Sequence, residues 1–95
     1  MIDRRTAVRL APKARLRFDK LSGKHMLLYP ERGLALSETA ARITTLCATE
    51  ALTAGAIAEQ LAAAYPDQPR AQIESEVVAY LRSLDERGLL IVEDA

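Results

Sequence analysis

The sequence predicts an α+β fold in which a small N-terminal three-stranded antiparallel sheet is followed by three helices. Two patterns indicate this fold. Between residues 15 and 36, short apolar or alternating runs are separated by Gly and Pro, which is typical of strands and tight turns. From residue 37 onward, apolar side chains recur at helical spacing behind good capping residues. A chain of 95 residues has room for one domain with one modest core.

The strands are expected in three short segments. Residues 15–19 alternate charged with apolar side chains, which places the apolar ones on one face of a strand. Residues 25–29 are apolar on both sides, as in a middle strand, and Pro30 ends that strand because proline lacks a backbone donor. Residues 33–36 form a third strand, in which Leu34 and Leu36 face the same way.

The region before the first strand shows neither the helical nor the strand period. Its basic residues are Arg4, Arg5, Arg9 and Lys13. Residues 1–14 are therefore expected to form a flexible basic arm, with order beginning near Arg15. The remaining chain divides into a single domain at residues 15–92 and an acidic tail at residues 93–95.

Each of the three helices has a readable start or stop. Ser37 and Thr53 are good N-caps for the first two, and Pro66 stops the second. The third begins near Pro69 and ends at Gly88. Their apolar stripes are Ala40, Ile43, Leu46 and Cys47, then Ile57, Leu61, Ala64 and Tyr65, then Ile73, Val77, Tyr80, Leu81 and Leu84. Residues 89–92 either add a strand or close the core.

Composition excludes several classes of protein. The single cysteine, Cys47, allows no internal disulfide, which fits a reducing compartment, so we expect a cytoplasmic protein. No apolar run approaches the roughly 18 residues that cross a bilayer, and the start lacks the apolar stretch of a signal peptide. We therefore expect no membrane association.

Charge is unevenly distributed although the formal net charge is zero. Residues 1–24 hold eight Lys and Arg against two Asp and Glu, a balance of +6, and residues 25–95 hold five against eleven, a balance of −6. One interpretation is a solvated strand face and tail. The other is an electrostatic guide for an acidic partner, or contact with the acidic helices of the same or another copy.

The residue types that carry catalysis are not clustered. His25 is the only histidine and has no partner at metal-ligand spacing, and Cys47 lies on a buried stripe. The four glycines lack the spacing of a phosphate loop, and the paired carboxylates lie on a helix surface. The sequence therefore predicts no enzyme, no metal site and no cofactor.

The order of strands and helices is winged-helix-like, which raises the question of nucleic-acid binding. The third helix would enter the major groove, but it carries a net charge of −1: Arg70, Arg82 and Arg87 against Glu74, Glu76, Asp85 and Glu86. Phosphates would be repelled, so we expect no nucleic-acid partner. Binding of duplexes through the basic arm remains an alternative function, as does dimerisation through an exposed strand edge.

Several segments resemble the PqqD family, the peptide chaperones of pyrroloquinoline quinone (PQQ) biosynthesis. The matching residues are 15–19 (RLRFD), 27–31 (LLYPE), 34–40 (LALSETA) and Ile43, followed by Val77, Leu81, Leu84, Gly88 and Leu89. The resemblance implies a non-enzymatic module that recognises a ribosomally made precursor peptide. It also implies that the module presents this peptide to a radical S-adenosylmethionine enzyme, and that the peptide binds as an added strand.

The expected peptide site lies between the third strand and the third helix. Its strand residues are Leu34, Ala35 and Leu36, whose backbone edge is open if this strand is outermost. Its helix residues are Glu74, Val78, Leu81 and Asp85, which a helical projection places along one flank beside the core stripe. Replacing Leu34 with Pro, or Val78 with Asp, is expected to abolish peptide binding with the fold retained. Pairing of the same edge with a second copy would give a homodimer.

Overall fold

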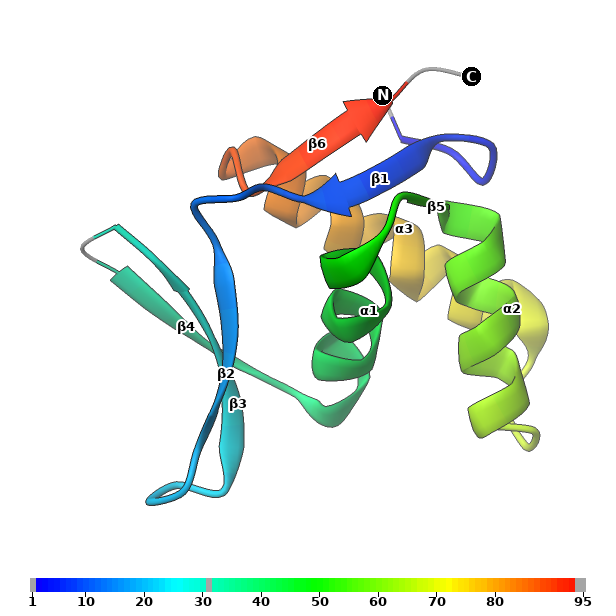
Figure 1. The fold of residues 1–95 in the computed structure, drawn as a ribbon. Coiled ribbons are helices and arrows are strands. Elements are labelled where there is room, and N and C mark those ends of the chain that lie inside the picture. The colour runs from blue at the N-terminus through cyan, green and yellow to red at the C-terminus, as the bar shows by residue number, and fades with distance from the viewer. Residues whose placement is uncertain (1, 31, 94–95) are drawn as a thin grey trace.

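A computed structural model describes residues 2–30 and 32–93. These residues form two three-stranded sheets and three helices (Figure 1). The elements are β1 (Ala7–Leu10), β2 (Arg15–Asp19), β3 (Lys24–Tyr29), β4 (Arg32–Leu36), α1 (Glu38–Thr49), β5 (Leu52–Thr53), α2 (Ala54–Ala64), α3 (Arg70–Glu86) and β6 (Leu90–Glu93). The α+β class is confirmed, with a second sheet that was not expected.

The first sheet consists of β2, β3 and β4 in that order, all antiparallel, and corresponds to the predicted sheet. Leu16, Leu27 and Leu34 lie opposite one another across its three strands. They share the face that packs on the core, with Leu27 fully buried. Cross-strand apolar rows of this kind fix the register, because a slip of one residue would turn every one of them to solvent.

The second sheet has the order β5–β1–β6 and corrects the expectation of a flexible arm at residues 1–14. β1 is its central strand, antiparallel to both neighbours, with Val8 fully buried and Arg9 exposed. Ile2 is buried as well, so order begins well before Arg15. The alternation in β1 covers only four residues, which is too short a pattern to identify a strand from sequence.

The open question about residues 89–92 is settled by the same sheet. β6 pairs with β1 from Leu10↔Leu90 to Ala7↔Glu93, which brings the two ends of the described chain together (Figure 1). Glu93, assigned from the sequence to an acidic tail, is therefore the last residue of a strand. The other two residues of that tail, 94 and 95, lie outside the described residues.

The helices begin and end as the local signals predict. The Ser37 side chain accepts a hydrogen bond from the backbone N–H of Ala40 at 3.1 Å, and Thr53 caps α2 in the same way through Ala56, also at 3.1 Å. These side chains satisfy backbone donors that the first turn leaves free. α3 has no side-chain cap at its N-terminus.

The helices pack against each other and against both sheets. α1 lies against the first sheet and β1, while α2 and α3 pair side by side (Figure 1). The first sheet projects to one side of the helices and the second lies across their ends. The core between these layers contains residues from all three helices together with Ile2, Val8, Leu10, Leu27, Leu36, Leu89 and Leu90. In the described part of the chain, no helix has both the length and the apolar character needed to cross a membrane.

Candidate functional site

β4 is an edge strand of the first sheet. Among the described residues it pairs with β3 alone, so its second side carries unpaired backbone groups. An open edge of this kind is a template on which another extended chain can add hydrogen bonds. The sequence-based expectation that residues 34–36 belong to an outer strand agrees with this arrangement.

The ladder register identifies which residues direct their N–H and C=O groups outward. The β3–β4 turn closes at Tyr29↔Arg32, and the pair that closes a two-residue turn is hydrogen-bonded. Such pairs alternate with non-hydrogen-bonded pairs, so Leu34 and Leu36 bond to β3. Gly33 and Ala35 consequently present their backbone groups to the open side.

The β2–β3 hairpin gives the same assignment independently. It closes at Asp19↔Lys24, so alternate residues of β3 starting from Lys24 bond to β2 and those between them bond to β4. The partners of that second set are again Leu34 and Leu36. The Leu34→Pro substitution suggested by the sequence would therefore break a hydrogen bond inside the sheet, whereas proline at Ala35 affects only the open edge.

The side chains of β4 alternate as the sequence predicts. Leu36 is buried, and Leu34 is partly buried and packs on the core. Ala35 is exposed on the opposite face. An added strand would therefore place every second side chain against the apolar face that Leu34 and Leu36 share.

Two of the predicted helix residues, Glu74 and Val78, lie beside the N-terminal segment. The Glu74 carboxylate forms an ion pair with Arg4 at 3.2 Å. Glu74 and Val78 line a hollow that Asp3 and Arg4 of the N-terminal segment also border. Leu81 is fully buried in the core and Asp85 is exposed. This flank of α3 therefore faces the N-terminal segment, which the sequence treated as mobile.

The opposite flank of α3 is the one that faces α1. Tyr80 lies on the other side of the buried stripe from Glu74 and Val78, given about 3.6 residues per turn. Its hydroxyl is 2.7 Å from the Thr44 hydroxyl of α1, which in turn donates to the Ala40 carbonyl at 2.8 Å. Burial raises the pKa of Tyr80 above its usual value of 10.0. β4 leads directly into α1, so this flank of α3 contacts the helix that follows the open edge.

Sequence reasoning placed Tyr80 in the core stripe and missed its position at a border. It is only partly buried and packs on the same core cluster as Leu34. The sequence contains one clue to this position: the hydroxyl of a buried tyrosine usually requires a hydrogen-bond partner on a neighbouring element. That partner, Thr44, belongs to the helix that follows β4.

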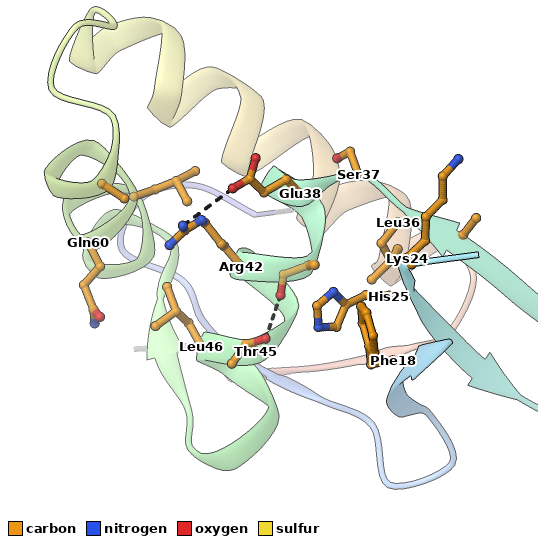
Figure 2. Close-up of a pocket in the computed structure, with 15 residues that line it drawn as sticks. Phe18, Lys24, His25, Leu36, Ser37, Glu38, Arg42, Thr45, Leu46 and Gln60 are labelled. Atoms are coloured by element: carbon orange, nitrogen blue, oxygen red, sulfur yellow. Dashed lines mark hydrogen bonds and ion pairs between the residues drawn. The ribbon is translucent and has the colours of Figure 1, made fainter. Parts of the chain in front are cut away.

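A hollow of about 780 Å³ opens between the tip of the β2–β3 hairpin, the C-terminal end of β4, α1 and α2. Figure 2 shows Phe18 and His25 on the hairpin side, with Arg42 and Leu46 on α1 and Gln60 on α2. The Phe18 and His25 rings meet edge to face with centroids 5.1 Å apart. This volume is within the range of small-molecule ligand pockets.

The potential reactive groups of the described residues include Cys47 and the metal-ligating residue types. Cys47 is fully buried, and this burial raises the pKa of its thiol to about 11, so it is protonated at neutral pH. No group of three or more His, Cys, Asp or Glu residues within 2–30 and 32–93 could hold a metal ion. The geometry that stands out is an open strand edge and a hollow.

Comparison with known proteins identifies the family. The family described as "Coenzyme PQQ synthesis protein D (PqqD)" matches residues 24–90. The chain belongs to the PqqD family. The resemblance seen in the sequence is thereby confirmed, and the match includes β3, β4 and all three helices.

Individual PqqD relatives support the same assignment. The "PqqA binding protein" of Rhodopseudomonas palustris is 42% identical over 77 residues, which cover 81% of this chain and 74% of the relative. A protein of the same name from Bradyrhizobium diazoefficiens is 38% identical over 77 residues, covering 81% and 73%.

A solved PqqD structure has the same fold. The solution structure of the PqqD part of Methylobacterium extorquens PqqCD superposes with a TM-score of 0.76 at 34% identity, covering 90% of this chain and 88% of that one. That protein is described as a functional, stand-alone recognition element for ribosomally synthesised and post-translationally modified peptides.

Proposed function

We propose that this protein binds the ribosomally made PQQ precursor peptide as an added strand on β4 and presents it to the radical S-adenosylmethionine enzyme of the pathway. The observation that carries the proposal is the open β4 edge in a member of the PqqD family. The relatives are named for binding PqqA, and the solved relative is a peptide-recognition element. In this proposal the chain supplies recognition and the partner enzyme supplies the chemistry.

Backbone pairing alone does not account for useful affinity. Gly33 and Ala35 together offer two donors and two acceptors, so a guest strand gains about four hydrogen bonds, worth a net of about 2–6 kcal/mol. Micromolar binding requires about 8 kcal/mol, and ordering the peptide adds a further cost. Apolar side chains of the peptide must therefore contribute by packing on the face of Leu34 and Leu36.

The helix side of the groove is reassigned on the basis of the contacts of α3. Glu74 pairs with Arg4 and Val78 borders a hollow beside the N-terminal segment, so we propose the flank that carries Tyr80 as the wall opposite β4. Tyrosine suits this role because its ring offers apolar area while its hydroxyl stays bonded to Thr44. Val78→Asp is then expected to leave peptide affinity within about threefold.

The test removes one backbone N–H donor from the open edge of β4. Ala35→Pro removes the outward N–H and keeps the ladder to β3, so peptide affinity should fall at least tenfold. Ala35→Ser keeps the N–H and is the matched control, expected within about threefold of the unmodified protein. Calorimetric titration of the precursor peptide measures both, with circular dichroism to confirm folding.

Hydrogen exchange provides an independent readout. On peptide binding, the amides of Gly33 and Ala35 should become protected, while those of Leu34 and Leu36 are already protected by β3. Equal affinity of the Pro and Ser variants, together with unchanged exchange at Gly33 and Ala35, would exclude this edge as the binding site.

A further inference from the structure

Large exposed apolar side chains are concentrated at one hairpin. Within the described residues there are three of them: Phe18 is 50% exposed, Leu21 is 99% exposed and Ile91 is 41% exposed. Phe18 and Leu21 both belong to the β2–β3 hairpin, whereas Ile91 lies on β6 in the other sheet. Neighbouring exposed apolar residues mark a binding surface more often than scattered ones do.

The turn that carries Leu21 is ordered by its own hydrogen bonds. The Asp19 carboxylate accepts from the Leu21 backbone N–H at 3.2 Å and from the Ser22 hydroxyl at 2.8 Å. The Gly23 N–H donates to the Asp19 carbonyl at 2.8 Å, with Gly23 at φ +72°. Leu21 is therefore held outward before any partner arrives, which reduces the entropy lost on binding.

The border of this tip is basic. Arg17, Lys20 and Lys24 all belong to this end of the hairpin, and none of them forms an ion pair with a carboxylate of residues 2–30 or 32–93. The one acid of the turn, Asp19, is already engaged by Ser22 and Leu21. Arg42 of the adjoining hollow is paired with Glu38 at 3.6 Å, so the unneutralised charge lies on the hairpin.

The hollow next to the tip is concave and of mixed polarity. Phe18 and Lys24 form its hairpin side, while Leu46 and Leu61 contribute apolar surface from α1 and α2. Figure 2 shows the Phe18 ring beside His25 at the mouth of this space. A protruding side chain can enter such a hollow, whereas the flat surface of a membrane cannot fill it.

The tip lies away from the open edge that the peptide is proposed to use. β3 separates β2 from β4, so the outer sides of β2 and β4 face in opposite directions. The hollow does touch Ala35 and Leu36 at the junction of β4 with α1. A peptide paired on β4 would nevertheless leave Phe18 and Leu21 uncovered.

We propose that the β2–β3 tip and the hollow beside it dock the enzyme that receives the peptide. The surface fits a protruding apolar side chain of that enzyme, bordered by carboxylates that pair with Lys20 and Lys24. This inference rests on the proposed function, because a protein that presents a peptide must contact its receiver through a second surface. It assigns that contact chiefly to Phe18 and Leu21 of the tip, which a peptide paired on β4 would leave uncovered.

The experiment measures enzyme binding without peptide. The purified radical S-adenosylmethionine enzyme is immobilised and titrated with the unmodified protein, Phe18→Ser, Leu21→Ser and Ile91→Ser. Ile91→Ser is the matched control because it also removes an exposed apolar side chain. We expect at least tenfold weaker binding for the two hairpin variants and less than threefold change for the control, with precursor-peptide affinity unchanged in all of them.

Several results would overturn this assignment. Enzyme affinity that is unchanged in both hairpin variants, or lost equally in Ile91→Ser, excludes the tip. Loss of peptide affinity in Phe18→Ser or Leu21→Ser assigns the tip to the peptide site instead.

Two further measurements test other occupants of the tip. Binding to phosphatidylserine vesicles that depends on Leu21 indicates a membrane, and light scattering that shows Leu21-dependent dimers indicates self-association. Failure of Ala35→Pro to weaken peptide binding contradicts the proposed function separately.

Discussion

Cys47 illustrates how position decides the chemistry of a residue. Its side chain is fully buried on the inner stripe of α1, and its Sγ lies 3.6 Å from the Thr44 carbonyl. Burial disfavours the thiolate, which raises the pKa of the thiol to about 11. The residue therefore acts as a small apolar core residue, as its place on the stripe indicated.

At this scale we predict a loss of stability at alkaline pH. The unfolded thiol titrates near 9.0 and the folded one near 11, so the stabilisation is complete below pH 9 and is lost as the pH rises through 11. Tyr80, whose pKa is also raised above 10.0, adds a loss in the same direction at higher pH. Urea unfolding between pH 8 and 11 should show a shallower decline in Cys47→Ala and in Tyr80→Phe. The same decline in all three proteins would contradict this assignment.

At the scale of elements, the end of α3 shows how one residue terminates a helix. Gly88 adopts φ +72°, its N–H donates to the Asp85 carbonyl at 2.9 Å, and the Leu89 N–H donates to the Leu84 carbonyl at 2.9 Å. This is a Schellman motif, which satisfies carbonyls that the last turn leaves free. Leu84 and Leu89 are both fully buried on either side of this motif. The motif therefore also sets the direction in which the chain enters β6.

We predict that Gly88→Ala lowers the free energy of unfolding by about 1–2 kcal/mol, the cost of a left-handed conformation for a residue with a Cβ atom. A Cβ atom there would meet only the end of the flexible Lys13 side chain, at 3.4 Å, so sterics add little. Gly88→Asn should lose less, because asparagine tolerates this conformation better. Urea unfolding compares the two, and a larger loss for Asn than for Ala would count against the backbone explanation.

Local sequence signals predict where the helices begin and end, but they do not predict which strands pair with one another. Ser37, Thr53 and Gly88 act on backbone groups within a few residues, so the sequence locates the helix ends. β1 was missed because its partners, β5 and β6, lie more than forty positions along the chain. A four-residue strand has too little pattern of its own to reveal such a pairing.

At the scale of the whole molecule, the second sheet closes the fold by joining both ends of the described chain. β1 forms the centre of that sheet, and the Arg82 guanidinium donates to the Ile2 carbonyl at 3.0 and 3.3 Å. The N-terminal segment therefore belongs to the core and to one flank of α3. This placement sets Glu74 and Val78 beside the N-terminal segment.

We predict that neighbouring substitutions in β1 have very different effects. Val8→Ala should lower the free energy of unfolding by about 2 kcal/mol, since it removes buried methyl groups and leaves a cavity. Arg9→Ala, on the exposed face, should change it by less than about 0.5 kcal/mol. Chemical denaturation measures both. Equal effects would mean that the N-terminal segment is an arm, as the sequence alone suggested.

The proposed site combines a strand part on β4 with a helix part on α3, and only the geometry of the strand part could be predicted from the sequence. The β4 part followed from strand alternation, because Leu34 and Leu36 must share a face. The α3 part did not follow, because a helical projection shows which residues share a flank and not which neighbour that flank faces. Only the contact of Tyr80 with Thr44 and the contact of Arg4 with Glu74 show which flank of α3 faces α1 and which faces the N-terminal segment.

The sequence by itself determined the helix boundaries, the first sheet, the burial of Cys47 and the resemblance to the PqqD family, because each rests on residues close together in the chain. The tertiary structure decided the second sheet, the orientation of α3 and the position of the hollow. These depend on segments far apart in sequence, whose contacts form only when burial of apolar surface compensates the entropy of bringing them together.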